Sequence, residues 1–138
     1  MKKAFWDLLE NELSCDPPKT NILIKRIKEL KNLMLLCVPS RYDIHLEIED
    51  SLDNDFIIHK IKVGLFNYQE LEKYIYYIFD KLKKFQARSG DENTDSFEKN
   101  IKTMINNKIK IPKILRDFLE FSFIKFENIY IQKQKFKV

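Results

Sequence analysis

Apolar residues recur along this chain at alternating intervals of four and three positions. That spacing places them on one face of an α-helix, because an α-helix completes a turn about every 3.6 residues. The two clearest series are Leu23, Ile27, Leu30, Met34 and Cys37, and Leu71, Ile75, Ile78, Leu82 and Phe85. Both predict amphipathic helices whose apolar stripes face a core.

Prolines and potential caps divide this pattern into separate helices. The Pro17-Pro18 pair and Pro39 interrupt it, because proline lacks the amide donor that a helix interior needs. Gly64 stands where a helix C-terminal cap is expected, and Asn67 where the next helix would begin. The predicted helices cover residues 2–14, 20–37, 40–52, 53–63, about 67–85, 95–107 and 112–128.

Three further local signals mark predicted helix ends. Ser40, with Asp43 three residues later, resembles a capping box at a helix N-terminus. Pro112 is a favoured residue in the first turn of a helix. The segment 87–96, "ARSGDENTDS", is polar and carries the second of two glycines, so it is predicted to be a loop.

The last third of the chain has a less regular pattern. Phe121 with Phe123, and Ile129 with Ile131, fit a two-residue period, so a short C-terminal strand stays open as an alternative to helix there. Two glycines and four prolines are too few for the many turns of a β-sandwich or barrel. We therefore predict an all-α fold, a single domain over residues 1–138 built as a bundle of about six or seven helices.

The charge balance is mildly basic, with 25 basic and 21 acidic residues and a net charge of +4. A candidate basic patch comprises Lys81, Lys83, Lys84, Lys133, Lys135 and Lys137, and a further cluster comprises Lys108, Lys110 and Lys113. These lysines leave a nucleic-acid-binding protein open as an alternative function. However, only four basic residues are arginine, which grips phosphate best. Abundant Lys, Ile and Asn also indicate an AT-rich genome, which favours lysine-rich solvated helix faces.

Both histidines lie in one acidic segment, "HLEIEDSLDNDFIIH", with five carboxylates between them. His45 with Glu49, and Asp55 with His59, have the i,i+4 spacing of helical metal ligands, so a metal-dependent enzyme is a third, less favoured alternative. On a helical wheel, however, the carboxylates fall mostly on solvated faces. We therefore interpret this segment as two helices joined by an acidic turn, and expect neither a metal nor a catalytic site.

Other sequence signals of catalysis or membrane insertion are weak. Cys37 lies on a core stripe, which is typical of a small buried hydrophobe, and Cys15 has no histidine nearby in sequence. Two glycines make no phosphate-binding loop, and no cofactor is expected. The longest apolar run, at 33–38, is far shorter than the ~20 residues of a membrane span. We expect a soluble intracellular protein, cytoplasmic with nuclear as an alternative.

The phenylalanines of the last predicted helix are too many for one helical face. They are Phe118, Phe121, Phe123 and Phe126, and they indicate either a central buried helix or a surface that contacts a partner. Together with Arg88, Asp91 and Glu92 of the predicted loop, they are the candidate partner-contact residues. The partner is expected to be a protein of unknown identity, and a homo-oligomer is left open.

Several segments, in order, resemble the T-complex protein 11 family. That family has a Lys-Glu-Leu helix ending at a proline, a Glu-Ile pair before a Leu-Asp-x-Asp-Leu-Ile stretch, and a Gly-x-Phe-Asp-Phe turn. Here these motifs match residues 28–39, Glu47-Ile48, 52–57 and 64–68. The family's Ala-Pro-Val-Arg-Asp-Glu segment is matched only at its ends, because residues 88–90 are Arg, Ser and Gly.

The resemblance covers residues 24–93, which correspond to the N-terminal part of the family. It implies an all-helical protein with no catalytic residues to transfer. It also implies a link to cyclic-AMP-dependent protein kinase signalling, as described for the family in animals and yeast. We therefore expect a non-enzymatic, helical protein-interaction or regulatory module. A short chain with this composition is expected from a protist or from a large DNA virus infecting one, with a virion location as an alternative.

Overall fold

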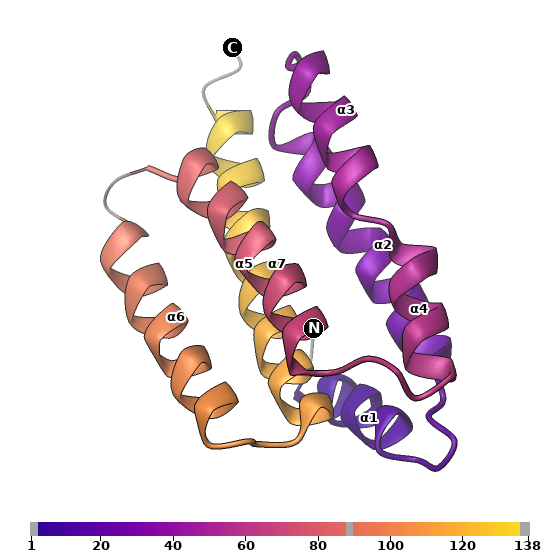
Figure 1. The fold of residues 1–138 in the computed structure, drawn as a ribbon. Helices are drawn as coiled ribbons and strands as arrows, with labels where there is room; N and C mark the ends of the chain where they lie inside the picture. The colour runs from indigo at the N-terminus through magenta and orange to yellow at the C-terminus, as the bar shows by residue number, and fades with distance from the viewer. Residues whose placement is uncertain (1–2, 88–89, 136–138) are drawn as a thin grey trace.

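The computed structural model describes residues 3–87 and 90–135, and every regular element in them is an α-helix (Figure 1). The all-α prediction is therefore confirmed. The helices are α1 (Lys3–Leu13), α2 (Asn21–Leu36), α3 (Tyr42–Ser51), α4 (Asn54–Lys62), α5 (Tyr68–Phe85), α6 (Asp91–Asn106) and α7 (Ile111–Lys135).

Helix α7, the last along the chain, is the centre of the bundle. It contacts α1, α2, α5 and α6, whereas α3 and α4 pack against α2. Figure 1 shows α5 and α7 side by side, with α6 on one side and the α2–α3–α4 group on the other. The C-terminal end of α5 and the last turns of α7 lie at the same end of the bundle (Figure 1).

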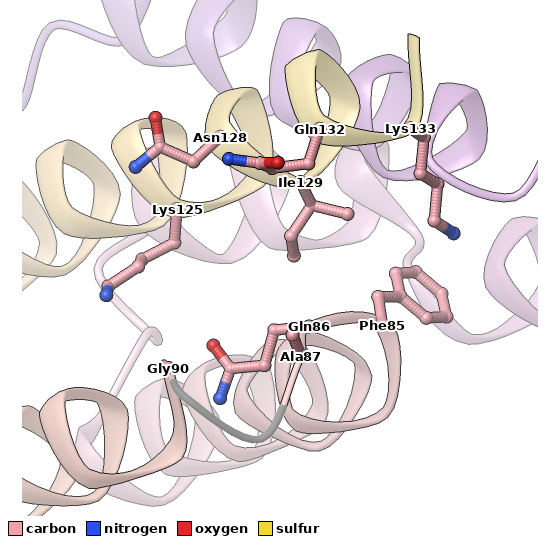
Figure 2. Close-up of a pocket in the computed structure, with 9 residues that line it drawn as sticks. All are labelled: Phe85, Gln86, Ala87, Gly90, Lys125, Asn128, Ile129, Gln132 and Lys133. Carbon is pink, nitrogen blue, oxygen red and sulfur yellow. The ribbon is translucent and has the colours of Figure 1, made fainter. Parts of the chain in front are cut away.

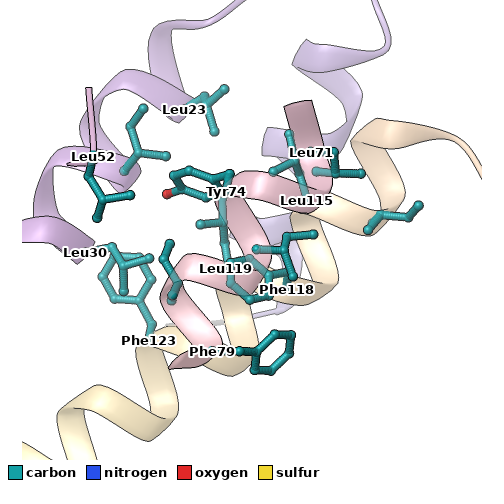
Figure 3. Close-up of a cluster of buried hydrophobic side chains, with 14 of the residues drawn as sticks. Leu23, Leu30, Leu52, Leu71, Tyr74, Phe79, Leu115, Phe118, Leu119 and Phe123 are labelled. Carbon is teal, nitrogen blue, oxygen red and sulfur yellow. The ribbon is translucent and has the colours of Figure 1, made fainter. Parts of the chain in front are cut away.

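The two apolar stripes form much of the core, as their spacing predicts. Leu23 to Met34 on α2 and Leu71 to Leu82 on α5 are buried at each predicted stripe position. Aromatic rings of α5 and α7 also pack against each other, with the Phe79 and Phe118 centroids 5.2 Å apart and their planes at 67° (Figure 3). This edge-to-face arrangement is a favoured geometry for buried rings.

Side chains and a glycine define both ends of α4 and the start of α5. The Asp53 carboxylate accepts a hydrogen bond from the Phe56 amide, and Asn67 Oδ1 accepts one from the Glu70 amide at 2.9 Å. Gly64 has a φ of +75°, which allows the two backbone hydrogen bonds of a Schellman C-terminal cap. The predicted roles of Gly64 and Asn67 are confirmed.

The predicted capping box at Ser40 is wrong. Arg41 occupies the N-cap position of α3, and no side chain caps the helix there. Asp43 instead pairs with Arg41, whose Nη2 lies 2.9 Å from Asp43 Oδ2. The arginine takes the carboxylate because a charge-assisted, two-pronged contact is stronger than a single bond to a backbone amide.

Two boundaries in the second half also differ from the sequence prediction. The segment predicted as a loop over 87–96 is helical from Asp91 onward, since Asp91 and Glu92 suit the positive end of the helix dipole. Helix α7 continues to Lys135, so the described residues contain no C-terminal strand. Its apolar residues wrap more than one face because α7 is surrounded by other helices, and this mimics a two-residue period.

Candidate partner-binding cleft

A cleft of about 410 Å³ opens where the end of α5 and the start of α6 face the last turns of α7 (Figure 2). Its lining comes from distant parts of the chain. The lining residues are Phe85, Gln86, Ala87, Gly90, Lys125, Asn128, Ile129, Gln132 and Lys133. This volume falls within the range of about 300–1,000 Å³ that is common for ligand sites in proteins.

Gln86 holds the α5–α6 side of the cleft together. Its Nε2 donates to Asp91 Oδ1 at 2.8 Å, and its Oε1 accepts from the Thr94 hydroxyl at 3.0 Å. A Cβ at Gly90 would lie only 3.1 Å from Gln86 Oε1, so the absence of a side chain there lets the two segments approach. This wall is therefore positioned by the hydrogen bonds of the Gln86 side chain.

The α7 side presents one apolar residue between two lysines. Lys125, Ile129 and Lys133 are spaced at i, i+4 and i+8, which brings them to one side of the helix (Figure 2). Lys133 Nζ donates to the carbonyl oxygen of Cys37 and lies 5.9 Å from the centroid of the Phe85 ring. The bottom of the cleft is thus apolar and its α7 rim is cationic.

The side chains of the lining can hold a bound segment. They are hydrocarbon, amide or ammonium groups. Among these described residues there is no histidine, cysteine or carboxylate that could act as a nucleophile or as a general acid or base. Amides and lysines around an apolar floor can instead orient a bound segment through hydrogen bonds and charge.

Most of the residues that the sequence predicts to contact a partner do not line this cleft. Phe118, Phe123 and Phe126 are buried in the core, so of the two interpretations of these phenylalanines the central buried helix describes the structure. Phe121 is half-buried and stacks on Phe97, with the centroids 3.9 Å apart and the planes at 8°.

The other contact candidates belong to the segment between α5 and α6. Asp91 is half-buried and accepts the bond from Gln86, whereas Glu92 is exposed in the first turn of α6. Arg88 lies outside the described residues. This segment therefore borders the cleft, with Ala87 and Gly90 in its lining.

The candidate basic patch is largely paired with carboxylates. Lys81 is buried against Glu47, which lowers the pKa of Glu47 mainly through the hydrogen bond from the lysine. Lys83 Nζ lies 2.6 Å from Glu98 Oε1, and Lys84 Nζ lies 3.0 Å from Asp80 Oδ2.

The remaining members of that patch lie near the end of α7. Lys133 lines the cleft and binds the Cys37 carbonyl, and Lys135 is exposed. Lys137 lies outside the described residues. The lysines therefore do not form one free cationic surface over the part of the chain that the structure describes.

The two histidines lie on different helices and in different surroundings. His45 Nε2 lies 2.8 Å from the Val38 carbonyl oxygen and 3.1 Å from that of Leu35, so its ring covers the end of α2. Glu49 pairs with Lys31 instead of with His45. His59 is exposed on α4. In residues 3–87 and 90–135, no three His, Cys, Asp or Glu side chains gather in a way that could hold a metal ion.

The cysteines behave as their sequence positions indicate. Cys37 is fully buried, and its Sγ lies 3.4 Å from the Phe126 carbonyl oxygen. Burial raises the pKa of the Cys37 thiol to about 11, so the thiol stays protonated and unreactive near neutral pH. Cys15 is exposed at the end of α1.

None of the described helices is both long and apolar enough to cross a lipid bilayer.

Sequence reasoning missed Gln86, Lys125, Asn128 and Gln132 as site residues. The available signal was the spacing of Lys125, Asn128 and Gln132, which places three polar residues on one face of the last helix. A central helix exposes polar side chains where its neighbours leave space.

Comparison with known proteins gives the family. The family model described as T-complex protein 11 matches residues 1–121. The human T-complex protein 11 homolog is 34% identical over 73 residues, which are 52% of this chain and 14% of the human protein. The rat T-complex protein 11 homolog is 36% identical over 76 residues, which are 54% of this chain and 13% of the rat protein. No solved structure matches the chain.

The matches cover different shares of this chain and of its relatives. The matched stretch is a small part of each curated relative, whereas the family model extends over most of this chain. The family match also reaches beyond the segment whose motifs carry the resemblance, and into α7, where it includes the buried Phe118 and the half-buried Phe121. The chain thus belongs to the T-complex protein 11 family.

Proposed function

We propose that residues 1–138 form one helical domain that acts as a non-enzymatic protein-interaction module, with the cleft between α5, α6 and α7 as its binding site. The observation that carries this proposal is the lining of that cleft, where an apolar floor at Phe85 and Ile129 is bordered by amides and lysines. A floor of this kind accepts an apolar side chain of a partner, and the border hydrogen-bonds the partner's backbone.

A regulatory role fits this proposal, and the family's link to cyclic-AMP-dependent protein kinase signalling suggests the setting. The chain spans only a small part of the curated relatives, so that link is a proposal for this protein. Nucleic-acid binding has less support. Lys81, Lys83 and Lys84 are already paired with carboxylates, and counterion release upon binding phosphates requires free cations.

The test is a selection from a displayed library of random peptides, with the complete chain as the target. Binders are then measured by fluorescence polarisation against the wild type and against Ala87→Trp. Ala87 is exposed at the mouth of the cleft, so a large side chain there should block the cleft without disturbing the core. Lys25→Trp, which introduces the same side chain at an exposed site on α2, is the control.

The proposal predicts peptides that lose at least about tenfold in affinity with Ala87→Trp, or about 1.4 kcal/mol, and little with Lys25→Trp. Both variants should show wild-type helix content by circular dichroism. A set of binders that is indifferent to Ala87→Trp, or a selection that yields no binders, contradicts the proposal.

A further inference from the structure

A second hollow adjoins the cleft of Figure 2. That hollow has a volume of about 520 Å³ and lies where the corner between α2 and α3 faces α5 and α7. Its lining residues are Val38, Arg41, Asp43, Ile44, Glu47, Lys81, Lys84, Phe85 and Lys133. The two hollows share Phe85 and Lys133 in their linings, so they adjoin at these two side chains at the end of the bundle. We refer to them together as the end groove.

Cations outnumber carboxylates in the end groove. Its lining has five cationic side chains and two carboxylates. The two carboxylates, Asp43 and Glu47, lie in the second hollow and are each paired with a cation of that hollow. The first hollow has two lysines and no carboxylate in its lining. An occupant with negative charge beside Lys125 and Lys133 therefore complements the groove best.

Lys125 and Lys133 can both bind a negatively charged occupant. Lys133 uses one donor for the Cys37 carbonyl, and an ammonium group has three, so further hydrogen bonds are possible without breaking that contact. Lys125 is half-buried and lies 5.5 Å from the centroid of Phe121, which limits the conformational entropy that it would lose on pairing.

A protein segment fits the end groove better than a nucleic acid does. The floor of the first hollow consists of Phe85 and Ile129. The Phe85 ring packs edge-to-face on Phe126, with centroids 6.3 Å apart, and Lys133 Nζ lies 5.9 Å from its centroid, so it offers no open aromatic face to a base. A nucleic acid in the second hollow would place its phosphates beside the carboxylates of Asp43 and Glu47, which repel them. The one arginine, Arg41, is already held by Asp43.

We propose that the end groove binds an acidic segment of a partner protein, with one apolar side chain of that segment between Phe85 and Ile129 and carboxylates beside Lys125 and Lys133. This inference rests on the proposed function and specifies the chemistry of the partner. The apolar side chain supplies burial, and the carboxylates select the segment and its direction.

The test uses the peptides that the display selection yields and that Ala87→Trp weakens. Their sequences should contain more Asp and Glu than the starting library. Lys125→Glu should weaken them at least about tenfold, and the control Lys25→Glu, which makes the same charge change on an exposed residue outside the groove, should not. A charge-swapped peptide with Lys in place of its acidic residues should regain affinity for Lys125→Glu.

The outcomes separate this inference from the proposed function. Peptides that depend on the cleft but are neutral or basic would overturn the inference and leave the proposed function standing. A selection without cleft-dependent peptides would overturn both. A fluorescein-labelled single-stranded deoxythymidine oligonucleotide that binds more tightly than the peptides, and that Lys125→Glu weakens, would assign the groove to nucleic acid instead.

Discussion

Replacing Glu47 with alanine should cost more stability than replacing the lysine with which it pairs. Lys81 on α5 is only 3% exposed and pairs with Glu47 on α3, and the Tyr77 hydroxyl donates to Glu47 Oε1 at 3.3 Å. Glu47→Ala leaves the ammonium group buried with only Asp80 nearby, at 3.9 Å. Lys81→Met instead removes the buried charge and keeps the volume of the side chain.

The expected magnitudes follow from burial. Losing one partner of a fully buried pair costs about 3–5 kcal/mol, but the Glu47 side chain is half-exposed and Asp80 gives partial compensation. We therefore expect Glu47→Ala to lower the free energy of unfolding by about 2 kcal/mol and Lys81→Met by less than about 1 kcal/mol. Adding Lys81→Met to Glu47→Ala should recover about 1 kcal/mol, because the uncompensated charge disappears.

Urea unfolding at pH 7 measures these changes, and thermal unfolding should show a loss of about 6–10 °C for Glu47→Ala. Asp50→Ala, on an exposed position of the same helix, is the control and should change little. The reasoning is refuted if Lys81→Met destabilises as much as Glu47→Ala, or if the double variant is the least stable of the three.

The pH dependence provides a second readout of the same pair. Because Lys81 lowers the pKa of Glu47 in the folded state, the carboxylate contributes stability that is present above the unfolded pKa of about 4.3. That contribution is lost as the pH falls through the lower, folded pKa. The difference in stability between wild type and Glu47→Ala should therefore be largest near neutral pH and shrink in acid.

Three further tests, one single substitution and two pairs of substitutions, address other parts of the fold by urea unfolding. Gly64→Ala should cost about 1 kcal/mol, because φ is +75° while no atom lies within 4 Å of the added Cβ; an unchanged stability would contradict the backbone argument. Phe118→Ala should cost about 3–5 kcal/mol and the exposed Phe56→Ala little, and equal costs would contradict the central position of α7. Asn67→Ala should cost about 1 kcal/mol and Ser40→Ala nearly nothing, whereas the reverse order would restore the predicted capping box.

Local patterns predicted the helices wherever the information itself is local. The stripes on α2 and α5, the caps at Asn67 and Gly64, and the breaks at prolines depend on neighbours within a turn or two. The start of α6 was missed because it depends on Thr94, which is buried and bound to Gln86 eight residues earlier in the chain. A polar run gives no local sign that one of its members faces inward.

The candidate site was beyond a sequence prediction for a related reason. Its walls are the end of α5, the start of α6 and the last turns of α7, and nothing in the sequence says that these ends meet. The excess of phenylalanines on α7 did indicate that this helix has apolar contacts over more than one face. It could not distinguish burial on several sides from a contact surface, because both require apolar residues over a wide arc.

The central place of α7 has a consequence for the order in which the protein can assemble during synthesis. All four helices that contact α7 leave the ribosome before it does, so their apolar stripes lack the packing surface of α7 until about the last fifth of these residues has been translated. Until then α1, α2, α5 and α6 present exposed apolar faces that chaperones recognise. Ribosome-bound chains halted before Ile111 should therefore be protease-sensitive, and chains extended beyond Lys135 should be protected.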